Sequence, residues 1–108
     1  MVRHPHNAVF AALGHPTRLA LLERLRQTPG RPVNALAAEF AVTRPAISLH
    51  LRVLREARLV SEERRGRERR YAIEPTGFHE ATQWLRRYES FWDDRLASLE
   101  RHLARRRR

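Results

Sequence analysis

The last third of this chain carries one continuous row of apolar side chains, and this row constrains the fold more than any other feature. The row consists of Ala81, Leu85, Tyr88, Trp92, Leu96, Leu99 and Leu103. Steps of three or four residues place side chains on one face of an α-helix. A helix over residues 77–103 would be roughly 40 Å long, which is longer than a small domain can cover. We therefore expect part of this face to pack against a partner.

Composition limits the class of protein. The chain has 108 residues, of which 42% are apolar and 31% are charged, as expected for one folded domain. No segment approaches the roughly 20 apolar residues that a membrane span requires, and the N-terminus lacks the apolar core of a signal peptide. We therefore predict a cytoplasmic protein with no membrane partner. The chain has no cysteine, which excludes disulfides, thiolate nucleophiles and thiol-based metal or redox sensors.

Positive charge is concentrated in the middle of the chain. The net charge of +10 divides into +3 for residues 1–42, +5 for residues 43–73, −2 for residues 74–104 and +4 for the arginines 105–108. Basic surfaces favour anionic partners. Residues 43–73 are therefore the first candidate for a nucleic-acid contact, and we interpret residues 105–108 as a disordered basic tail.

The first two predicted helices lie on either side of Gly14. Residues 5–13 form a short helix that this glycine ends. The next helix begins at Pro16, because proline suits the first helical turn, and it ends at the turn cluster of residues 28–32. Its leucines recur at helical spacing, which indicates a largely buried helix.

Two further helices, joined by a tight connection, follow the turn cluster. Asn34 is the predicted N-cap of a short helix that reaches Phe40, and Thr43 is the predicted N-cap of a helix over residues 44–57. Both side chains can accept a hydrogen bond from the first turn of a helix. Two helices with such a connection are typical of a helix-turn-helix.

Two short strand-like runs around Gly66, residues 59–64 and 69–73, predict a β-hairpin. The complete order of elements is then α-α-α-α-β-β-α. This mainly α fold with a small β-hairpin is a winged helix-turn-helix. We place a single domain over residues 1–104, which includes the long final helix.

The helix over residues 44–57 is the candidate recognition helix. Burial of Ile47, Leu51 and Leu54 turns its opposite face outward, and an α-helix fits the major groove of DNA. The candidate DNA contacts are Thr43, Arg44, Pro45, Ser48, Leu49 and Arg52. Arg44 suits a bidentate pair with guanine. Leu49 either packs on a thymine methyl group or is an ordinary exposed apolar residue.

The hairpin turn is the second candidate DNA contact. Gly66 permits a tight turn, and Arg65 and Arg67 beside it suit a narrow, electronegative minor groove. The alternative is a solvated hairpin whose arginines pair with Glu63 and Glu68. Because the helix and the hairpin are both basic, we favour double-stranded DNA as the partner.

Three motifs in this order resemble the ArsR-type transcriptional repressors. They are residues 10–25 (FAALGHPTRLALLERL), Leu36-Ala37 followed by residues 43–60 (TRPAISLHLRVLREARLV), and the wing from Arg64 to Ile73. The resemblance covers about residues 8–75, and residues 88–96 (YESFWDDRL) are similar to a metal-independent branch of the family. It implies a homodimer that represses transcription from a palindromic operator.

The resemblance and the final helix together predict a dimer interface formed by the terminal helices. The candidate interface residues are Val9, Phe10, Leu13, Leu85, Tyr88, Trp92 and Leu99. A second interpretation stays open, in which Trp84, Tyr88 and Trp92 line a pocket for a small-molecule effector.

Metal sensing is the main alternative within the same fold. A metal site on the final helix requires paired His and carboxylate ligands, but Asp93 is followed two positions later by Arg95, and His102 three positions later by Arg105. The remaining histidines near the N-terminus, His4, His6 and His15, form only a loose group. We therefore predict no metal site and no cofactor.

Two other classes of function are disfavoured. No phosphate-binding loop or nucleophile elbow is present, and Ser48 and His50, two positions apart on a helix, point away from each other, so we predict no enzymatic activity. His50 is interpreted as a packing residue at the edge of the core. A basic RNA-binding or scaffolding protein is less favoured, because the aromatic residues lie apart from the arginine cluster.

Overall fold

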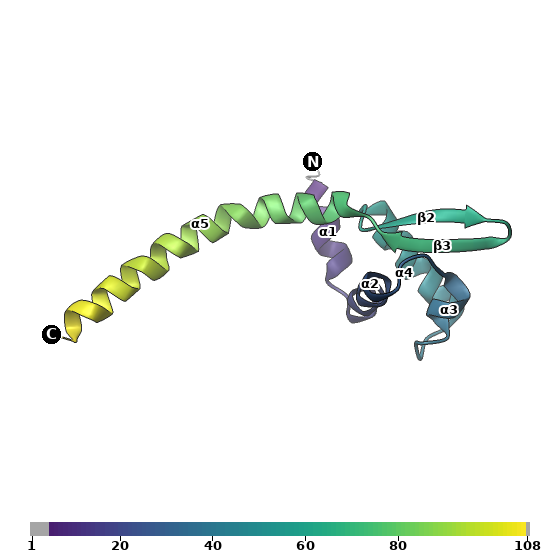
Figure 1. Cartoon of the computed structure of the whole chain (residues 1–108), viewed down its shortest axis with the longest axis horizontal. Coiled ribbons are helices and arrows are strands. Elements are labelled where there is room, and N and C mark those ends of the chain that lie inside the picture. The colour runs from purple at the N-terminus through teal and green to yellow at the C-terminus, as the bar shows by residue number, and fades with distance from the viewer. Residues whose placement is uncertain (1–4, 108) are drawn as a thin grey trace.

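The computed structural model describes residues 5–107 and confirms a mainly α fold with a small sheet (Figure 1). The helices are α1 (Pro5–Leu13), α2 (Pro16–Gln27), α3 (Val33–Ala37), α4 (Arg44–Glu56) and α5 (Pro75–Arg106). The strands are β1 (Arg31–Pro32), β2 (Val60–Arg65) and β3 (Glu68–Ile73). Helices α3 and α4 form the helix-turn-helix, and β2 and β3 form the wing.

The core lies where α1, α2, α3 and α4 meet the wing. Its fully buried large side chains are Val9, Leu21, Leu25, Leu36, Ile47, Leu51, Leu54, Leu59 and Val60. The predicted buried face of α4 is therefore confirmed. Val9 corrects the sequence interpretation, because a side chain with no exposed surface in the protomer belongs to the core and not to a dimer interface.

A short strand replaces part of the predicted turn cluster. Residues 28–30 turn the chain, but Arg31 and Pro32 pair with Tyr71 and Arg70 of β3, which gives the antiparallel order β1-β3-β2. Gly30 has a φ of 75°, and its N–H donates to the Tyr71 carbonyl at 3.0 Å. Two residues show no alternation, so this strand has no signal in its own sequence. Its edge position tolerates the proline.

The two predicted N-caps of the helix-turn-helix have different outcomes. The Thr43 cap is confirmed, since its Oγ1 accepts a hydrogen bond from the Ala46 N–H at 3.3 Å. The Asn34 cap is wrong, because α3 begins one residue earlier, at Val33, and Pro32 occupies the cap position without a side-chain hydrogen bond. Asn34 instead lies on the first turn of α3 and is exposed.

The start of α5 is fixed against the end of α4. The chain leaves α4 through Arg58 in the left-handed region, with a φ of 59°. The Leu59 N–H donates to the Leu54 carbonyl at 2.9 Å, which is the Schellman arrangement. The Gly77 N–H then donates to the Arg58 carbonyl at 2.8 Å. This contact orients α5 relative to α4.

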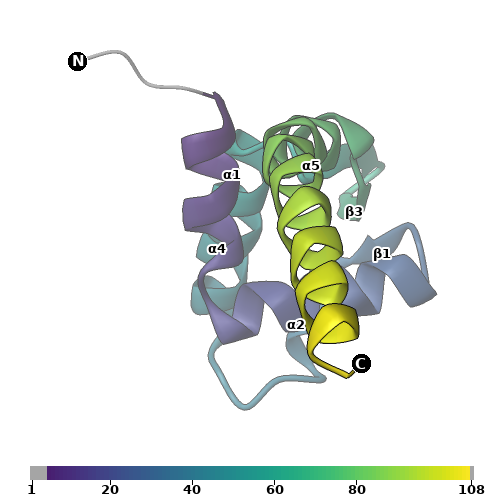
Figure 2. The ribbon, with the colours of Figure 1, turned by 90° about the vertical axis from the view of Figure 1, so that its left-hand side faces the viewer.

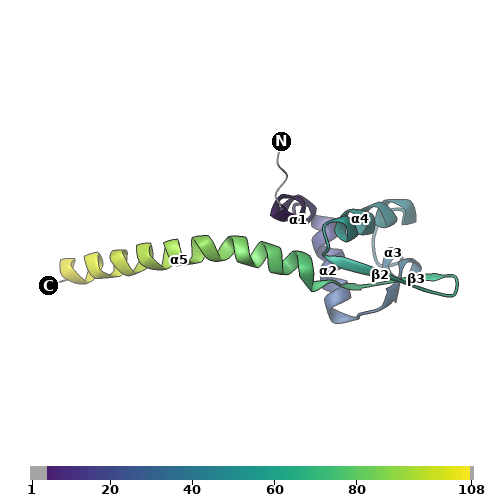
Figure 3. The ribbon, with the colours of Figure 1, turned by 90° about the horizontal axis from the view of Figure 1, so that it is seen from above.

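Helix α5 projects away from the rest of the domain. The longest dimension of the molecule is 69 Å, and the C-terminal end of α5 and the tip of the wing lie at its two ends (Figures 1 and 3). The helix continues through Arg106, so Arg105 and Arg106 of the predicted disordered tail are helical. Arg108 and His4 lie outside the described residues. No helix within residues 5–107 is long and apolar enough to cross a membrane.

Candidate nucleic-acid interface

The N-terminal half of α4 presents a polar face to solvent. Burial of its opposite face leaves Arg44, Pro45, Leu49 and Arg52 exposed and Ser48 half-buried. Leu49 is 59% exposed, so residues 5–107 leave most of its side chain uncovered. These residues occupy the positions from which a recognition helix contacts base edges.

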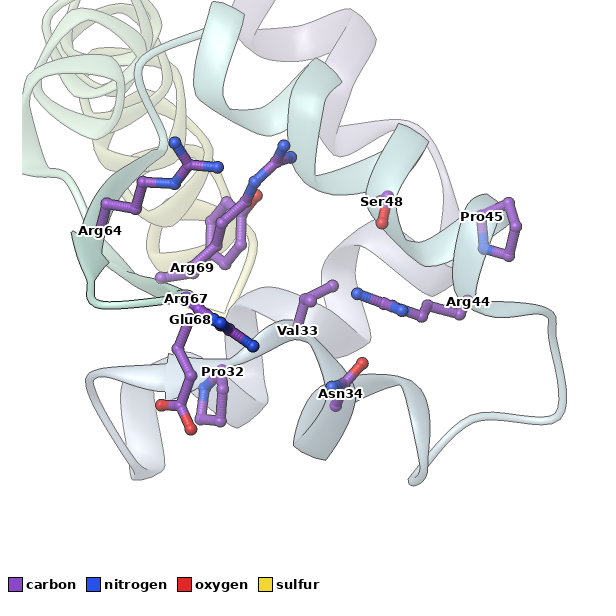
Figure 4. Close-up of a pocket in the computed structure, with 11 residues that line it drawn as sticks. Pro32, Val33, Asn34, Arg44, Pro45, Ser48, Arg64, Arg67, Glu68 and Arg69 are labelled. Atoms are coloured by element: carbon purple, nitrogen blue, oxygen red, sulfur yellow. The ribbon is translucent and has the colours of Figure 1, made fainter.

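A groove of about 500 Å³ separates this face from the wing (Figure 4). Four arginines and one acid line it: Arg44, Arg64, Arg67, Arg69 and Glu68. The side chains of Arg44, from α4, and Arg67, from the wing, point into the groove from opposite sides (Figure 4). The groove thus combines positive charge from two elements that are distant in sequence.

Ion pairs decide which arginines are available. The acids of the basic segment all pair with its arginines: Glu56 with Arg52, Glu63 with Arg65, Glu68 with Arg70, and Glu62 with both Arg55 and Arg69. Within residues 5–107, Arg44, Arg64 and Arg67 form no ion pair. Free guanidinium groups can bind phosphate or guanine without first losing a carboxylate partner.

The arginines near the tip of the wing lie on two different faces of the hairpin. Successive strand residues point to opposite faces, so Arg64 lines the groove, whereas Arg65 lies in a separate depression with Glu63 and Arg70. Arg65 pairs with Glu63 at 3.4 Å. This pair is the one expected if the hairpin is solvated and its arginines bind the neighbouring acids. Arg64 was missed by the sequence argument, although strand alternation could have identified it.

The remaining predicted residues lie beside the groove. Leu49 and Arg52 line a neighbouring depression of about 290 Å³ that also contains Pro45 and Ser48. Thr43 is exposed and caps α4. Arg69 and Asn34 belong to the groove lining but were not predicted, because their positions depend on the pairing of β3 and on the true start of α3.

Glu62 joins α4 to the wing. Its carboxylate pairs with Arg55 of α4 and with Arg69 of β3, the latter at 3.5 Å. The Glu62 side chain is only 17% exposed. This double pair bridges the two elements that border the groove.

Apolar side chains along α5 form a second candidate interface. Leu85, Tyr88, Trp92 and Leu99 are each about half exposed, between 47% and 57%. The other predicted interface residues lie at the base of the helix. Phe10 packs on Trp84 with ring centroids 5.1 Å apart, and Leu13 borders an apolar groove between α2 and α5.

The aromatic residues of α5 do not converge on one pocket. Trp84 packs against α1, and its ring centroid lies 4.7 Å from that of Tyr88. Trp92 lies about two helical turns after Trp84 and contacts Phe91, with ring centroids 5.6 Å apart. The depression beside Trp84 measures about 170 Å³ and is bordered by polar residues of α5.

Two histidines lie together between α2 and α4. The ring centroids of His15 and His50 are 4.5 Å apart, and Nδ1 of His15 accepts a hydrogen bond from the Thr17 N–H at 3.1 Å. Partial burial, followed by the nearby His15 and Arg18, lowers the pKa of His50 below its usual range. His15 therefore belongs with His50 and not with the N-terminal histidines. Within residues 5–107, no three His, Asp or Glu side chains are grouped to hold a metal ion.

We expect the chain to lose stability as the pH falls from about 7 to about 5. Because the pKa of His50 is lowered in the folded state, the unfolded chain binds this proton more readily. The stability is fully present above the pKa of an unfolded histidine, about 6.5, and is lost as the pH falls below it. Thermal melts across this range should show a smaller loss for His50→Leu. The exposed His79 provides the control, since His79→Asn should retain the full loss; an unchanged pH dependence in His50→Leu would contradict the assignment.

Comparison with known sequences gives relatives of one class. A helix-turn-helix domain family matches residues 13–63. The chain is 45% identical over 75 residues to the HTH-type transcriptional regulator Rv2034 of Mycobacterium tuberculosis, which covers 69% of this chain and 68% of that protein. It is 30% identical over 92 residues to the transcriptional repressor SdpR of Bacillus subtilis, which covers 83% of this chain and 99% of that protein.

Comparison with solved structures gives the same class. A crystal structure of an ArsR family transcriptional regulator superposes with a TM-score of 0.75 and 32% identity, over 86% of this chain and 97% of that chain. The solution structure of a homodimeric winged helix-turn-helix DNA-binding domain from Mycobacterium bovis superposes with a TM-score of 0.62 and 25% identity, over 85% of this chain and 82% of that chain.

Proposed function

This chain belongs to the ArsR family of winged helix-turn-helix transcriptional regulators, and we propose that it acts in the cytoplasm as a homodimeric repressor on an inverted-repeat DNA operator. The observation that carries the proposal is the groove between α4 and the wing, where Arg44 and Arg67 face each other and form no ion pair in the described part of the chain. As a member of this family the chain is a DNA-binding regulator and not an enzyme.

The residues around the groove divide into two roles. Arg44, Ser48 and Leu49 lie on the exposed face of α4 and contact base edges in the major groove, with Thr43, Pro45 and Arg52 beside them. Arg67 and Arg64 contact the phosphate backbone and the adjacent minor groove. Arg65 is a weaker candidate because it pairs with Glu63 on the other face of the wing.

Two copies of the chain complete the DNA-binding unit. The half-exposed apolar side chains of α5 lack cover in one protomer, and pairing with a second copy buries them. A twofold dimer presents two recognition helices to half-sites about one helical turn apart. The relative SdpR, a transcriptional repressor, supports the repressor part of the proposal. The homodimeric domain from Mycobacterium bovis supports the dimer part.

Salt dependence tests the DNA contact itself. Two copies of the basic groove neutralise roughly 6–10 phosphates, so the logarithm of the affinity should fall with the logarithm of the salt concentration at a slope of about −5 to −9. Titration of one duplex at several salt concentrations, with the sequence selected from random duplexes, measures this slope. A flat response would contradict DNA binding by this surface.

Two single variants test the division of roles. Arg44→Ala should weaken the free energy of binding to the specific site by about 1–3 kcal/mol and relax the base preference at one position of that site. Arg67→Ala should weaken binding to specific and random duplexes alike and reduce the magnitude of the salt slope by about 1 for each affected half-site. Competition titrations measure both quantities, and equal effects of the two variants on both duplexes would refute the division.

We also propose that operator binding does not depend on metal. The chain has no cysteine, and Arg95 stands where a partner ligand to Asp93 would be required. Adding low concentrations of zinc, nickel or copper, or removing metal with a chelator, should leave operator affinity unchanged. A stoichiometric metal that shifts this affinity more than about tenfold, a coupling of about 1.4 kcal/mol, would overturn the proposal.

A further inference from the structure

The neighbouring depression beside Leu49 continues the groove along α4. The two hollows share the residues Pro45, Ser48, Arg69 and Tyr71. The depression adds two basic residues of α4, Arg52 and Arg55. The groove and the depression together form one strip between α4 and the wing, and Arg69 of β3 belongs to both parts of it.

A DNA backbone would lie along this strip in the proposed complex. There α4 enters the major groove and the wing reaches the adjacent minor groove. The sugar-phosphate backbone separates the two grooves of a duplex, so it passes between α4 and the wing. Helix α5 leaves this path open, because it projects from the end of the domain opposite the wing tip, toward the viewer in Figure 2. Backbone phosphates therefore come within reach of the arginines in the depression.

The carboxylate of Glu62 lies in this strip and pairs with an arginine at each of its oxygens. Its Oε2 pairs with Nη1 of Arg55 from α4, and its Oε1 pairs with Nε of Arg69 from β3 at 3.5 Å. The Glu62 side chain is 17% exposed, whereas those of Arg55 and Arg69 are 49% and 54% exposed. The acid is thus the least exposed of the three, and both arginines remain accessible from solvent.

We propose that Arg55 and Arg69 form a binding site for a phosphate of the DNA backbone and that the Glu62 carboxylate occupies this site in the free protein. This inference rests on the proposed DNA-binding function and adds to it a second contact that the chain itself inhibits. Carboxylate and phosphate groups both accept charge-assisted hydrogen bonds from the planar guanidinium group. Glu62 therefore competes with the phosphate for the same donors.

The competition lowers the affinity for DNA without preventing binding. Ion pairs between half-exposed side chains contribute little to stability, so a phosphate can displace the Glu62 carboxylate from the two arginines. The displaced carboxylate stays near the phosphate, and repulsion between the two anions weakens the new contact. Because phosphates are the same at every sequence, Glu62 lowers the affinity for random and specific duplexes alike.

The adjacent acid Glu63 provides a comparison within the same strand. Successive residues of β2 point to opposite faces, and Glu63 lies in the depression on the other face of the wing, where it pairs with Arg65. Neither Glu63 nor Arg65 lines the strip. Glu62 and Glu63 thus differ in location and not in charge, so the same substitution at both separates local competition from a general change in net charge.

Titration of the full chain with a random-sequence duplex at several salt concentrations tests the proposal. At about 0.1 M salt, Glu62→Gln should bind this duplex at least about tenfold more tightly than the wild type. The magnitude of the salt slope should rise by about 0.9 for each site that gains a phosphate, or about 1.8 for a homodimer. Glu63→Gln adds the same charge and should change both quantities much less. Thermal melts verify that both variants fold.

A double variant tests whether Arg55 is the donor that Glu62→Gln releases. Arg55→Gln combined with Glu62→Gln restores the net charge of the wild type but removes one of the two arginines of the site. It should lose most of the gain of Glu62→Gln, in affinity and in salt slope. Arg26→Gln combined with Glu62→Gln has the same net charge and should retain the gain, because Arg26 lies on α2 and pairs with Glu23.

The outcomes separate this inference from the proposed DNA-binding function. Binding by Glu62→Gln that is equal to or weaker than that of the wild type would overturn the competition and leave Glu62 as a structural bridge. Equal gains for Glu62→Gln and Glu63→Gln, or equal losses for the two double variants, would reduce the effect to net charge and also overturn the site. A wild-type chain that binds no duplex would contradict the proposed function and this inference together.

Discussion

Trp92→Asp is expected to convert the dimer to monomers and to weaken operator binding by at least about a hundredfold. Each dimer loses two aromatic anchors and places two carboxylates in the proposed apolar interface. Trp92 is 57% exposed in the protomer, so the substitution removes little packing within the fold. Sedimentation and operator titration measure the two effects, and far-UV circular dichroism verifies the helices.

The matched control for this variant lies on the same helix. Ser90 is exposed and is nearly opposite the apolar row on α5, so Ser90→Asp introduces the same charge without entering the proposed interface. It should remain dimeric and bind the operator as the wild type does. A helical Trp92→Asp chain that stays dimeric would show that the interface lies elsewhere.

Gly77→Ala is expected to lower the free energy of unfolding by about 2–3 kcal/mol. A Cβ at this position would lie 2.5 Å from the carbonyl oxygen of Ala57 and 2.7 Å from that of Arg58. Both obstacles are backbone atoms at the end of the recognition helix and cannot rotate away. The clash therefore outweighs the gain of up to about 1 kcal/mol that alanine brings to a helix.

Gly14→Ala separates the clash from the general effect of replacing glycine. A Cβ at Gly14 would meet its nearest atoms at 3.5 Å, which is ordinary contact, so this variant should unfold close to the wild-type temperature. Gly77→Ala should unfold roughly 8–24 °C lower. An unaltered melting temperature for Gly77→Ala would mean that α5 can shift relative to α4 without cost.

Local signals in the sequence were sufficient for most of the fold. The helix over residues 5–13, the Thr43 cap and the buried face of α4 were all predicted from spacing and capping chemistry, and the structure has them. Gly66 at the wing tip has a φ of 61°, as the turn requires. Each of these features depends on interactions between residues that are close together in the chain, so it can be predicted from the local sequence.

The candidate DNA interface was predicted only in part. The basic segment and the recognition helix follow from composition and periodicity, and Arg44 and Arg67 both reach the groove. The sequence does not indicate which arginines lack an ion-pair partner. This depends on pairs such as Glu62 with Arg69, which form across the two strands of the wing. Strand alternation places Arg64 in the groove and Arg65 outside it.

Spacing and charge along the chain were enough to predict the five helices, the wing hairpin, the basic middle segment and the length of the apolar face on α5, because periodicity and charge are properties of neighbouring residues. Three features follow from the folded structure alone: Val9 belongs to the core, Arg31 and Pro32 form a strand, and Gly77 must lack a side chain. These features arise where segments distant in the chain come within van der Waals or hydrogen-bonding distance. Such contacts leave no periodic trace in either segment, since each depends on a surface that exists only after the other has folded.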